Sequence, residues 1–321
     1  MNLNKLFFLL LIMSIMIMIS SYSWFTMWIM MEVNLLIMIS IISMNSPYST
    51  ESAIKYFIVQ CSASLIFLMG IILLMNNFMM FNYMIFMSLM LKMSAAPFHF
   101  WFPEIIETLK WPPSIMLMTI QKISPLIITT YLPMSMNSII IFSLISILMG
   151  SMQGILQTSF KKILTFSSIT HTGWMIITIN LSMNIWTIYF IFYSLSLMSI
   201  VLIMIYYNIS NLMNITSIPS LMFITFVKMM ITMSGIPPFI MFLVKWLTIQ
   251  LLIFSSFNIQ ALIILIITLI TIYMYLQTIF SLLLMSPIKK HLIIKKMPIL
   301  LIIPSIMSMF LIMVLFFPFF M

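Results

Sequence analysis

The chain has 321 residues, of which 64% are hydrophobic and 5% are charged, and its formal net charge at pH 7 is +9. This composition excludes a water-soluble globular domain, in which about a quarter of the residues are charged. The lysines stand singly or in pairs between apolar stretches, so they do not form the basic face typical of nucleic-acid-binding proteins.

The apolar runs predict an all-α, polytopic bundle of transmembrane helices. A helix needs about 20 apolar residues to cross a bilayer, so the chain has room for about eleven crossings and little else. Breaking the runs at polar, proline and asparagine clusters places these crossings at residues 5–21, 24–44, 53–76, 79–101, 113–133, 137–157, 162–181, 184–207, 218–253, 258–285 and 298–320. The first run lacks the flanks of a targeting segment, so we expect a membrane helix there. We therefore expect one transmembrane domain over residues 1–321.

Two crossings contain helix-breaking segments. Ser94-Ala95-Ala96-Pro97 lies inside the fourth, and Ser234-Gly235-Ile236-Pro237-Pro238 lies inside the ninth. Proline removes a backbone donor and clashes with the preceding turn, so both helices are expected to open. Open backbone at membrane depth must face protein or water, and paired interrupted helices are typical of transport sites. A packing kink is the alternative for either break alone.

Charge in the links and at the ends of the crossings falls on alternate links, and therefore on one predicted face of the membrane. These residues are Lys5, Glu51, Lys55, Glu104, Glu107, Lys110, Lys161, Lys162, Lys289, Lys290, Lys295 and Lys296. The rule that positive loops stay inside then places the N-terminus on the inner side and the C-terminus on the opposite side.

The amino-acid usage indicates where the protein is made. The chain has 40 Met and five Gly but no Arg and no Asp, a bias that favours A/T-rich codons. Animal mitochondrial genomes fit this bias, whereas methionine as a packing residue does not explain the missing arginine. We therefore expect a multi-pass protein of the mitochondrial inner membrane, with its N-terminus in the matrix and its C-terminus in the intermembrane space.

Five charged residues fall within predicted crossings and away from their ends: Glu32, Lys92, Lys122, Lys228 and Lys245. Each would cost several kcal/mol facing lipid, so each is expected to face protein or water, with snorkelling to the interface as the competing interpretation. The depth of Glu32, Lys122 and Lys245 favours function, whereas Lys228 has no evident partner. As the one acidic residue within a span, Glu32 should face a lysine, and Lys92 is the first candidate. A lysine beside a movable carboxylate can gain and lose a proton, as a relay requires.

Three histidines add candidates. His171 lies in Ser167-Ser168-Ile169-Thr170-His171-Thr172-Gly173, where neighbouring hydroxyls predict either a proton wire or a structural histidine bonded to another helix. His99 follows the first helix break and is either a gate or an interface residue. His291, among the terminal lysines, is expected to be solvated.

The sequence predicts no cofactor or metal bound by this chain. Cys61 is its one cysteine, and no phosphate-binding loop, nucleotide fingerprint or cluster of metal ligands is present. Without a nucleotide-binding site or a redox centre, such a chain would have to receive the energy for transport from partner proteins.

Seven short motifs together resemble one family. They are Met31-Glu32-Val33-Asn34-Leu35-Leu36, Ser49 to Phe57, Lys92 with Ala96 to Glu104, Gln121-Lys122, Gln157 to Lys162, Ser167 to Trp174, and Gly235 to Trp246. Their order is similar to that of the antiporter-like, proton-pumping subunits of the membrane arm of respiratory complex I.

The resemblance implies eleven helices and two discontinuous helices in inverted repeats. It also implies that Glu32 and Lys92 form the family's glutamate–lysine pair, that Lys122 is its central lysine, and that Lys245 serves the exit half-channel. Lys228 matches no family position. Where the family usually has two glycines before the proline pair, this chain has Ser234-Gly235.

The resemblance further implies partners and a task. FMN, iron–sulfur clusters and ubiquinone would be bound by other subunits of an NADH:ubiquinone reductase, and neighbouring antiporter-like and small membrane subunits and lipids would surround this one, with no nucleic acid. Its expected function is proton translocation from matrix to intermembrane space. A stand-alone cation/proton antiporter and a purely structural membrane-arm subunit are the alternatives.

Overall fold

The computed structural model describes residues 3–44, 49–75, 81–207, 209 and 219–285. Within these ranges the chain forms helices joined by short links, without a strand. Five of the described helices are long and apolar enough to cross a membrane, so the predicted all-α, polytopic class is confirmed. The predicted crossing at 298–320 and His291 lie outside the described residues. The chain divides into two compact units, Met1–Ser146 and Ile147–Met321.

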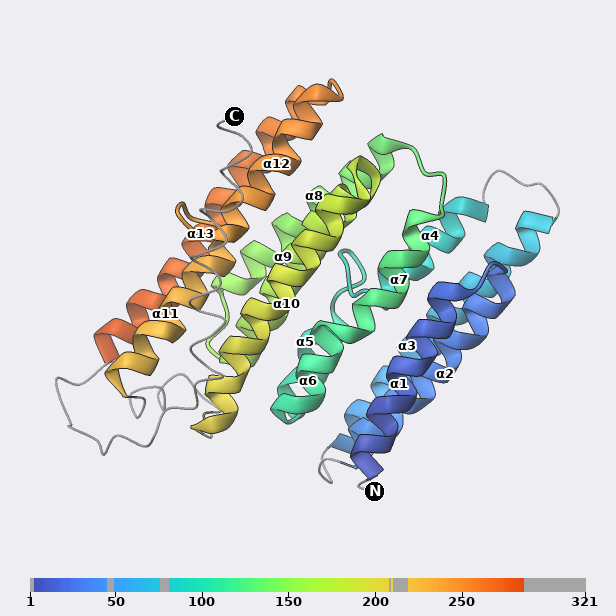
Figure 1. Ribbon diagram of the computed structural model, residues 1–321, viewed down its shortest axis with the longest axis horizontal. Coiled ribbons are helices and arrows are strands. Elements are labelled where there is room, and N and C mark those ends of the chain that lie inside the picture. The colour runs from blue at the N-terminus through green and yellow to red at the C-terminus, as the bar shows by residue number, and fades with distance from the viewer. Residues whose placement is uncertain (1–2, 45–48, 76–80, 208, 210–218, 286–321) are drawn as a thin grey trace. The chain divides into compact units, whose positions relative to one another are not determined.

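Unit 1 begins with three long helices that lie side by side (Figure 1). Its helices are α1 (Leu3–Ser20), α2 (Trp24–Ser43), α3 (Ser49–Met75), α4 (Phe81–Lys92), α5 (Trp101–Thr108), α6 (Trp111–Met118) and α7 (Ile120–Thr130). Helix α4 packs against α3 and α7, and α5 packs against α3. Helix α8 (Met136–Ile155) begins in this unit and ends in the next.

Helix α2 shows how the apolar stripe sets orientation. Met27, Met31, Asn34, Leu35 and Met38 are all buried and recur at helical spacing, so they form one inward face. Neighbouring positions on a helix differ by about 100° around its axis, so the residue that follows Met31 lies at the edge of this face.

The first predicted helix break is confirmed and has a defined cap. Helix α4 ends at Lys92, and Ser94 adopts a left-handed conformation with φ 55°. The Ala95 N–H donates to the Met90 carbonyl over 2.9 Å, and the Ser94 N–H donates to the Leu91 carbonyl over 3.2 Å. This pattern satisfies carbonyls that the end of a helix leaves without partners.

The crossing predicted as one helix at 113–133 is divided into α6 and α7, which corrects the prediction. The division falls at Thr119, whose φ of −120° and ψ of −74° are not helical. The Thr119 hydroxyl donates to the Ile115 carbonyl over 2.8 Å, and the Lys122 N–H donates to the Thr119 carbonyl over 3.0 Å. Side-chain bonds of this kind compete with the helical pattern. The new helix therefore begins two residues before Lys122.

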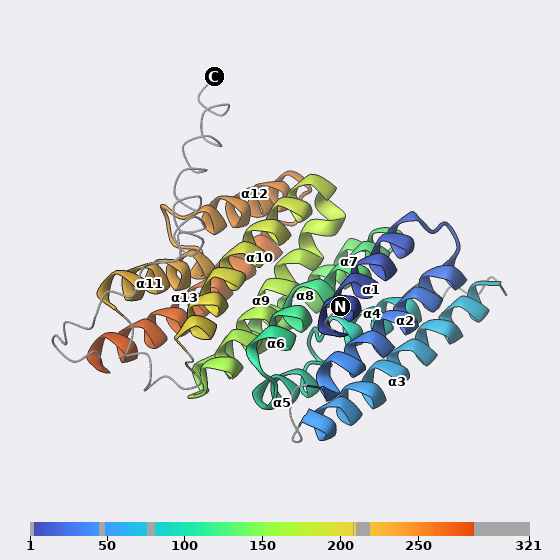
Figure 2. The same ribbon diagram turned by 60° about the horizontal axis from the view of Figure 1, so that its bottom comes forward.

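Unit 2 surrounds a fully buried helix. Helix α9 (Phe160–Leu181) has every residue from Ile163 to Ile179 buried, as expected for a helix enclosed by others. The remaining helices are α10 (Met183–Tyr206), α11 (Ser220–Ser234), α12 (Ile240–Phe254) and α13 (Asn258–Met285). Both α10 and α12 pack against α9, and α13 packs against α11 and α12 (Figure 2). The second predicted break is confirmed, because α11 ends where Gly235 takes φ 77°.

Candidate functional site

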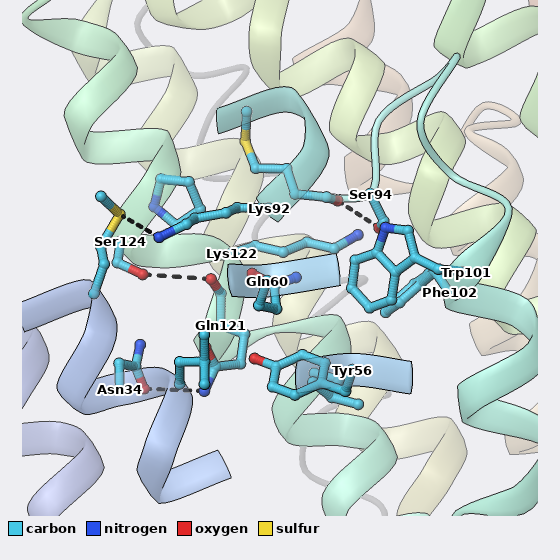
Figure 3. Close-up of a pocket in the computed structure, with 15 residues that line it drawn as sticks. Asn34, Tyr56, Gln60, Lys92, Ser94, Trp101, Phe102, Gln121, Lys122 and Ser124 are labelled. Atoms are coloured by element: carbon cyan, nitrogen blue, oxygen red, sulfur yellow. Dashed lines mark hydrogen bonds between the residues drawn. The ribbon is translucent and has the colours of Figure 1, made fainter. Parts of the chain in front are cut away.

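The structure brings Lys92 and Lys122 to one cavity inside unit 1 (Figure 3). The cavity has a volume of about 20 Å³. About 10–15 Å³ of such volume holds one water molecule, so the cavity has room for at least one. Its polar lining consists of Asn34, Tyr56, Gln60, Lys92, Ser94, Gln121, Lys122 and Ser124. Water placed there would have several hydrogen-bond partners.

Lys122 is buried, with 2% of its surface exposed. Its ammonium nitrogen lies 5.2 Å from the centre of the Phe102 ring, a distance at which a cation is attracted by the ring face. Phe102 belongs to α5, the short helix after the first break, so that break contributes one wall of the cavity.

Lys92 is the last residue of α4, and its half-buried side chain turns toward α2. Its ammonium group donates to the Met31 sulfur over 3.6 Å. Figure 3 shows the ammonium groups of Lys92 and Lys122 pointing to opposite ends of the cavity. This arrangement keeps two like charges apart while both side chains border the same space.

Lys92, the lysine predicted to face Glu32, contacts the neighbouring residue Met31 in this structure. The Glu32 Oε1 atom is buried and has no hydrogen-bond partner among the described residues. Because Met31 faces the cavity, Glu32 lies about 100° away at the edge of the buried stripe of α2. The carboxylate is still near enough for its charge to act on Lys92 and on Tyr56. Glu32 and Lys92 are therefore coupled through their charges.

A side-chain bond that sequence reasoning missed joins two walls of the cavity. The Gln121 amide donates to the Asn34 carbonyl oxygen over 3.0 Å, which links α7 to α2. In the sequence both residues stand out only as parts of motifs. A signal existed, because a buried amide in an apolar helix needs a hydrogen-bond partner.

Lys245 in unit 2 is held by the second broken helix. Its ammonium group donates to the Ser234 carbonyl over 2.9 Å and lies 5.7 Å from the centre of the Trp174 ring. Ser234 ends α11, where free carbonyls and the helix dipole favour a cation. The lysine, 6% exposed, therefore caps the half-helix that precedes its own.

His171 is buried on α9, with 1% of its surface exposed. Its Nδ1 is 2.8 Å from the Tyr189 hydroxyl and its Nε2 is 3.3 Å from the Tyr275 hydroxyl. The ring of Tyr193 packs against the imidazole with centroids 4.9 Å apart. Sequence reasoning missed all three tyrosines, because they come from α10 and α13.

The hydroxyls predicted to accompany His171 are committed to their own helix. Ser167, Ser168, Thr170 and Thr172 each donate to the carbonyl three residues earlier, over 2.7 Å in every case. Their oxygens can still accept, but their protons are directed at the backbone.

The other predicted residues are not among those that line the cavity. His99 is fully buried, and its ring stacks on Phe100 with centroids 4.4 Å apart. Lys228 is half-buried on α11. Lys55 forms ion pairs with Glu51 at 3.1 Å and with Glu104 at 3.5 Å, which brings charges from two predicted loops together.

The chemistry available in both clusters is proton binding and transfer, through ammonium, imidazole, phenol and amide groups. Among the described residues, no three His, Cys, Asp or Glu side chains gather as metal ligands. Cys61 is a free, half-buried thiol.

Comparison with known proteins gives concordant matches. The family model for the transmembrane part of NADH:quinone oxidoreductase and Mrp antiporter subunits matches residues 21–79 and 74–275. NADH-ubiquinone oxidoreductase chain 2 of Anopheles gambiae is 37% identical over 88% of this chain and 86% of its own length. The protein of the same name from Locusta migratoria is 35% identical over 83% of this chain and 81% of its own length. A chain of respiratory complex I from Thermus thermophilus has the same fold, with a TM-score of 0.82 over 97% of this chain and 77% of that chain at 18% identity.

Proposed function

Because the chain belongs to the NADH:quinone oxidoreductase/Mrp antiporter family, as its motifs had indicated, we propose that it translocates protons as a membrane-arm subunit of complex I. The proposed direction is from the matrix to the intermembrane space across the mitochondrial inner membrane. The N-terminus would face the matrix, and other antiporter-like and small membrane subunits would be its neighbours.

One observation carries this proposal: two lysines border a polar, water-sized cavity in a chain built to cross a membrane. A charged group at membrane depth is costly, and such groups mark ion and proton paths. Asn34, Gln60 and Gln121 supply the hydrogen bonds that a water molecule needs in such a place. A merely structural bundle would have no need of either lysine there.

The step in the cavity conserves charge. In the proposed step the Lys92 side chain turns from Met31 toward the water in the cavity and gives it one N–H proton, and that water gives one of its own protons to the neutral amine of Lys122. One N–H bond breaks on Lys92 and one forms on Lys122, while the water is unchanged. The two lysines exchange charged and neutral states, which avoids two ammonium groups in one cavity.

We assign Lys245 and His171 to the second part of the path. The charged form of Lys245 is stabilised, because the Ser234 carbonyl at the end of α11 accepts a hydrogen bond from its ammonium group. His171 has two ring nitrogens in hydrogen bonds, as a residue that receives and passes on protons requires.

Energy must come from partner subunits, where NADH oxidation and ubiquinone reduction would take place with FMN and iron–sulfur clusters. Moving one charge against 100 mV costs about 2.3 kcal/mol. Glu32 is the proposed receiver, because its buried oxygen has no hydrogen bond to a described residue and its charge acts on Lys92. A shift of this carboxylate changes how tightly Lys92 holds its proton.

The proposal predicts that Glu32→Gln lowers proton pumping by assembled complex I. Glutamine keeps the shape of the side chain and removes its charge, and a lost coupling of 1–3 kcal/mol corresponds to roughly a 5- to 150-fold change. The measurement is proton transport by the purified complex in proteoliposomes, with NADH oxidation recorded in parallel. Glu107→Gln, which changes an exposed carboxylate, is the matched control. Normal pumping by assembled Glu32→Gln complex would remove Glu32 from the mechanism.

The two alternatives give different results. A stand-alone cation/proton antiporter would exchange ions as a purified chain in liposomes, whereas our proposal expects no exchange without the complex. A structural subunit would leave pumping unchanged in the Glu32 and Lys122 variants alike.

A further inference from the structure

The imidazole of His171 is enclosed by tyrosines from two other helices. Tyr189 and Tyr193 come from α10 and Tyr275 comes from α13, and all three are fully buried. A buried phenol needs a hydrogen-bond partner, and the imidazole serves two of the three. The cluster therefore has the form of a chain, with a hydroxyl at each ring nitrogen.

This row of hydrogen-bonded side chains can carry a proton because of the donors and acceptors that it contains. A neutral imidazole has one N–H donor and one acceptor nitrogen, and a phenol both donates and accepts. At any moment one tyrosine donates to the bare nitrogen while the other accepts from the N–H group.

We propose that Tyr189 and Tyr275 are proton-relay residues on either side of His171, so that the histidine works by exchanging its tautomers. This inference rests on the proposed function and adds two residues to the path. The proton that enters binds to the Tyr189 oxygen, whose own hydroxyl proton moves to Nδ1. The Nε2 proton then moves to the Tyr275 oxygen, whose original proton leaves to a water molecule.

The relay balances in atoms and charge. One O–H bond breaks and one forms on each tyrosine, and one N–H bond breaks and one forms on the imidazole. The ring is neutral before and after, and one proton has crossed from the α10 side to the α13 side. Before a second transfer in the same direction, the proton on Nδ1 must return to Nε2, which restores the starting tautomer.

Tyr193 has a different role. Its ring lies against the imidazole at an interplanar angle of 41°. We assign it to positioning the plane of the imidazole, because this ring contact holds the imidazole from one side.

The test uses assembled complex I in proteoliposomes. Tyr275→Phe and Tyr189→Phe each remove one relay oxygen and keep the ring, so proton transfer through His171 is expected to slow by about 100-fold. Tyr273→Phe is the matched control, because Tyr273 lies on the same helix and is 57% exposed. Tyr193→Phe should also retain pumping.

The outcomes separate this inference from the proposed function. Loss of pumping in both relay variants, with Tyr193→Phe and Tyr273→Phe active, supports the relay. Normal pumping by assembled Tyr275→Phe or Tyr189→Phe complex overturns it, and if Lys122→Met still abolishes pumping then the proposed function stands. If Lys122→Met pumps normally, the proposed function itself fails.

If the variants do not assemble, a measurement on the unaltered complex still tests the relay. Infrared difference spectra of complex with isotope-labelled histidine and tyrosine should show imidazole and phenol bands changing together during turnover. Imidazole bands that change while the phenol bands stay constant would exclude the relay.

Discussion

Replacing Lys122 with methionine is expected to abolish proton transfer through unit 1 while the complex still assembles. Methionine is about as long as the lysine stem and fills the same space, but it cannot bind a proton. Loss of a positioned proton donor or acceptor slows transfer by about 10²- to 10⁴-fold. The measurement is proton transport together with NADH oxidation by purified complex in proteoliposomes.

The structure indicates why this variant should remain folded. Lys122 is 2% exposed, and replacing a buried charge with an apolar side chain of similar volume is often neutral or stabilising, by about 1–4 kcal/mol. The attraction between the ammonium group and the Phe102 ring is lost, and this loss offsets about 1–2 kcal/mol of that stabilisation. Lys110→Met, at an exposed lysine, is the control. This account would be contradicted if the Lys122→Met variant assembled poorly and the complex that did assemble still pumped protons.

Replacing Gly235 with alanine is expected to act through Lys245. An alanine Cβ at this position would lie 2.9 Å from the Lys245 ammonium nitrogen and 3.0 Å from its Cδ atom, so the flexible lysine must move. The φ of 77° adds about 1–2 kcal/mol of backbone cost for a residue with a side chain. The displaced lysine loses its bond to the Ser234 carbonyl, and pumping should fall as far as it does in Lys245→Met.

A double-variant comparison distinguishes this effect from simple destabilisation. If Gly235→Ala acts through the lysine, then the double variant with Lys245→Met should pump no less than Lys245→Met alone. Thermal unfolding of the complex measures the backbone cost separately. Additive losses of pumping would show that Gly235 acts independently of Lys245.

Helix breaks were predictable where the residue types themselves forbid a helix. Proline and glycine marked the openings after Lys92 and after Ser234, and both appear in the structure. The break at Thr119 carries neither residue. The Thr119 hydroxyl donates to the Ile115 carbonyl in the preceding turn, a bond that threonines also make in unbroken helices.

The residues of the candidate site were predictable from the energetic cost of burying a charge. The contacts between them were not. A charge in an apolar helix stands out in a sequence, which is how Lys122 and Lys245 were found. The partners of these residues depend on which faces meet, and Met31, one helical position before Glu32, contacts Lys92. The tyrosines around His171 are ordinary apolar-helix residues in sequence, and only packing among α9, α10 and α13 shows their hydroxyls to be paired.

A density map of assembled complex I that resolves ordered water would show directly whether water occupies the cavity that Lys92 and Lys122 line. Our account predicts at least one water within hydrogen-bonding distance of the Lys122 ammonium nitrogen and of an amide from Asn34, Gln60 or Gln121. A cavity closed by dry side-chain packing, with Lys122 reached by no water, would contradict it.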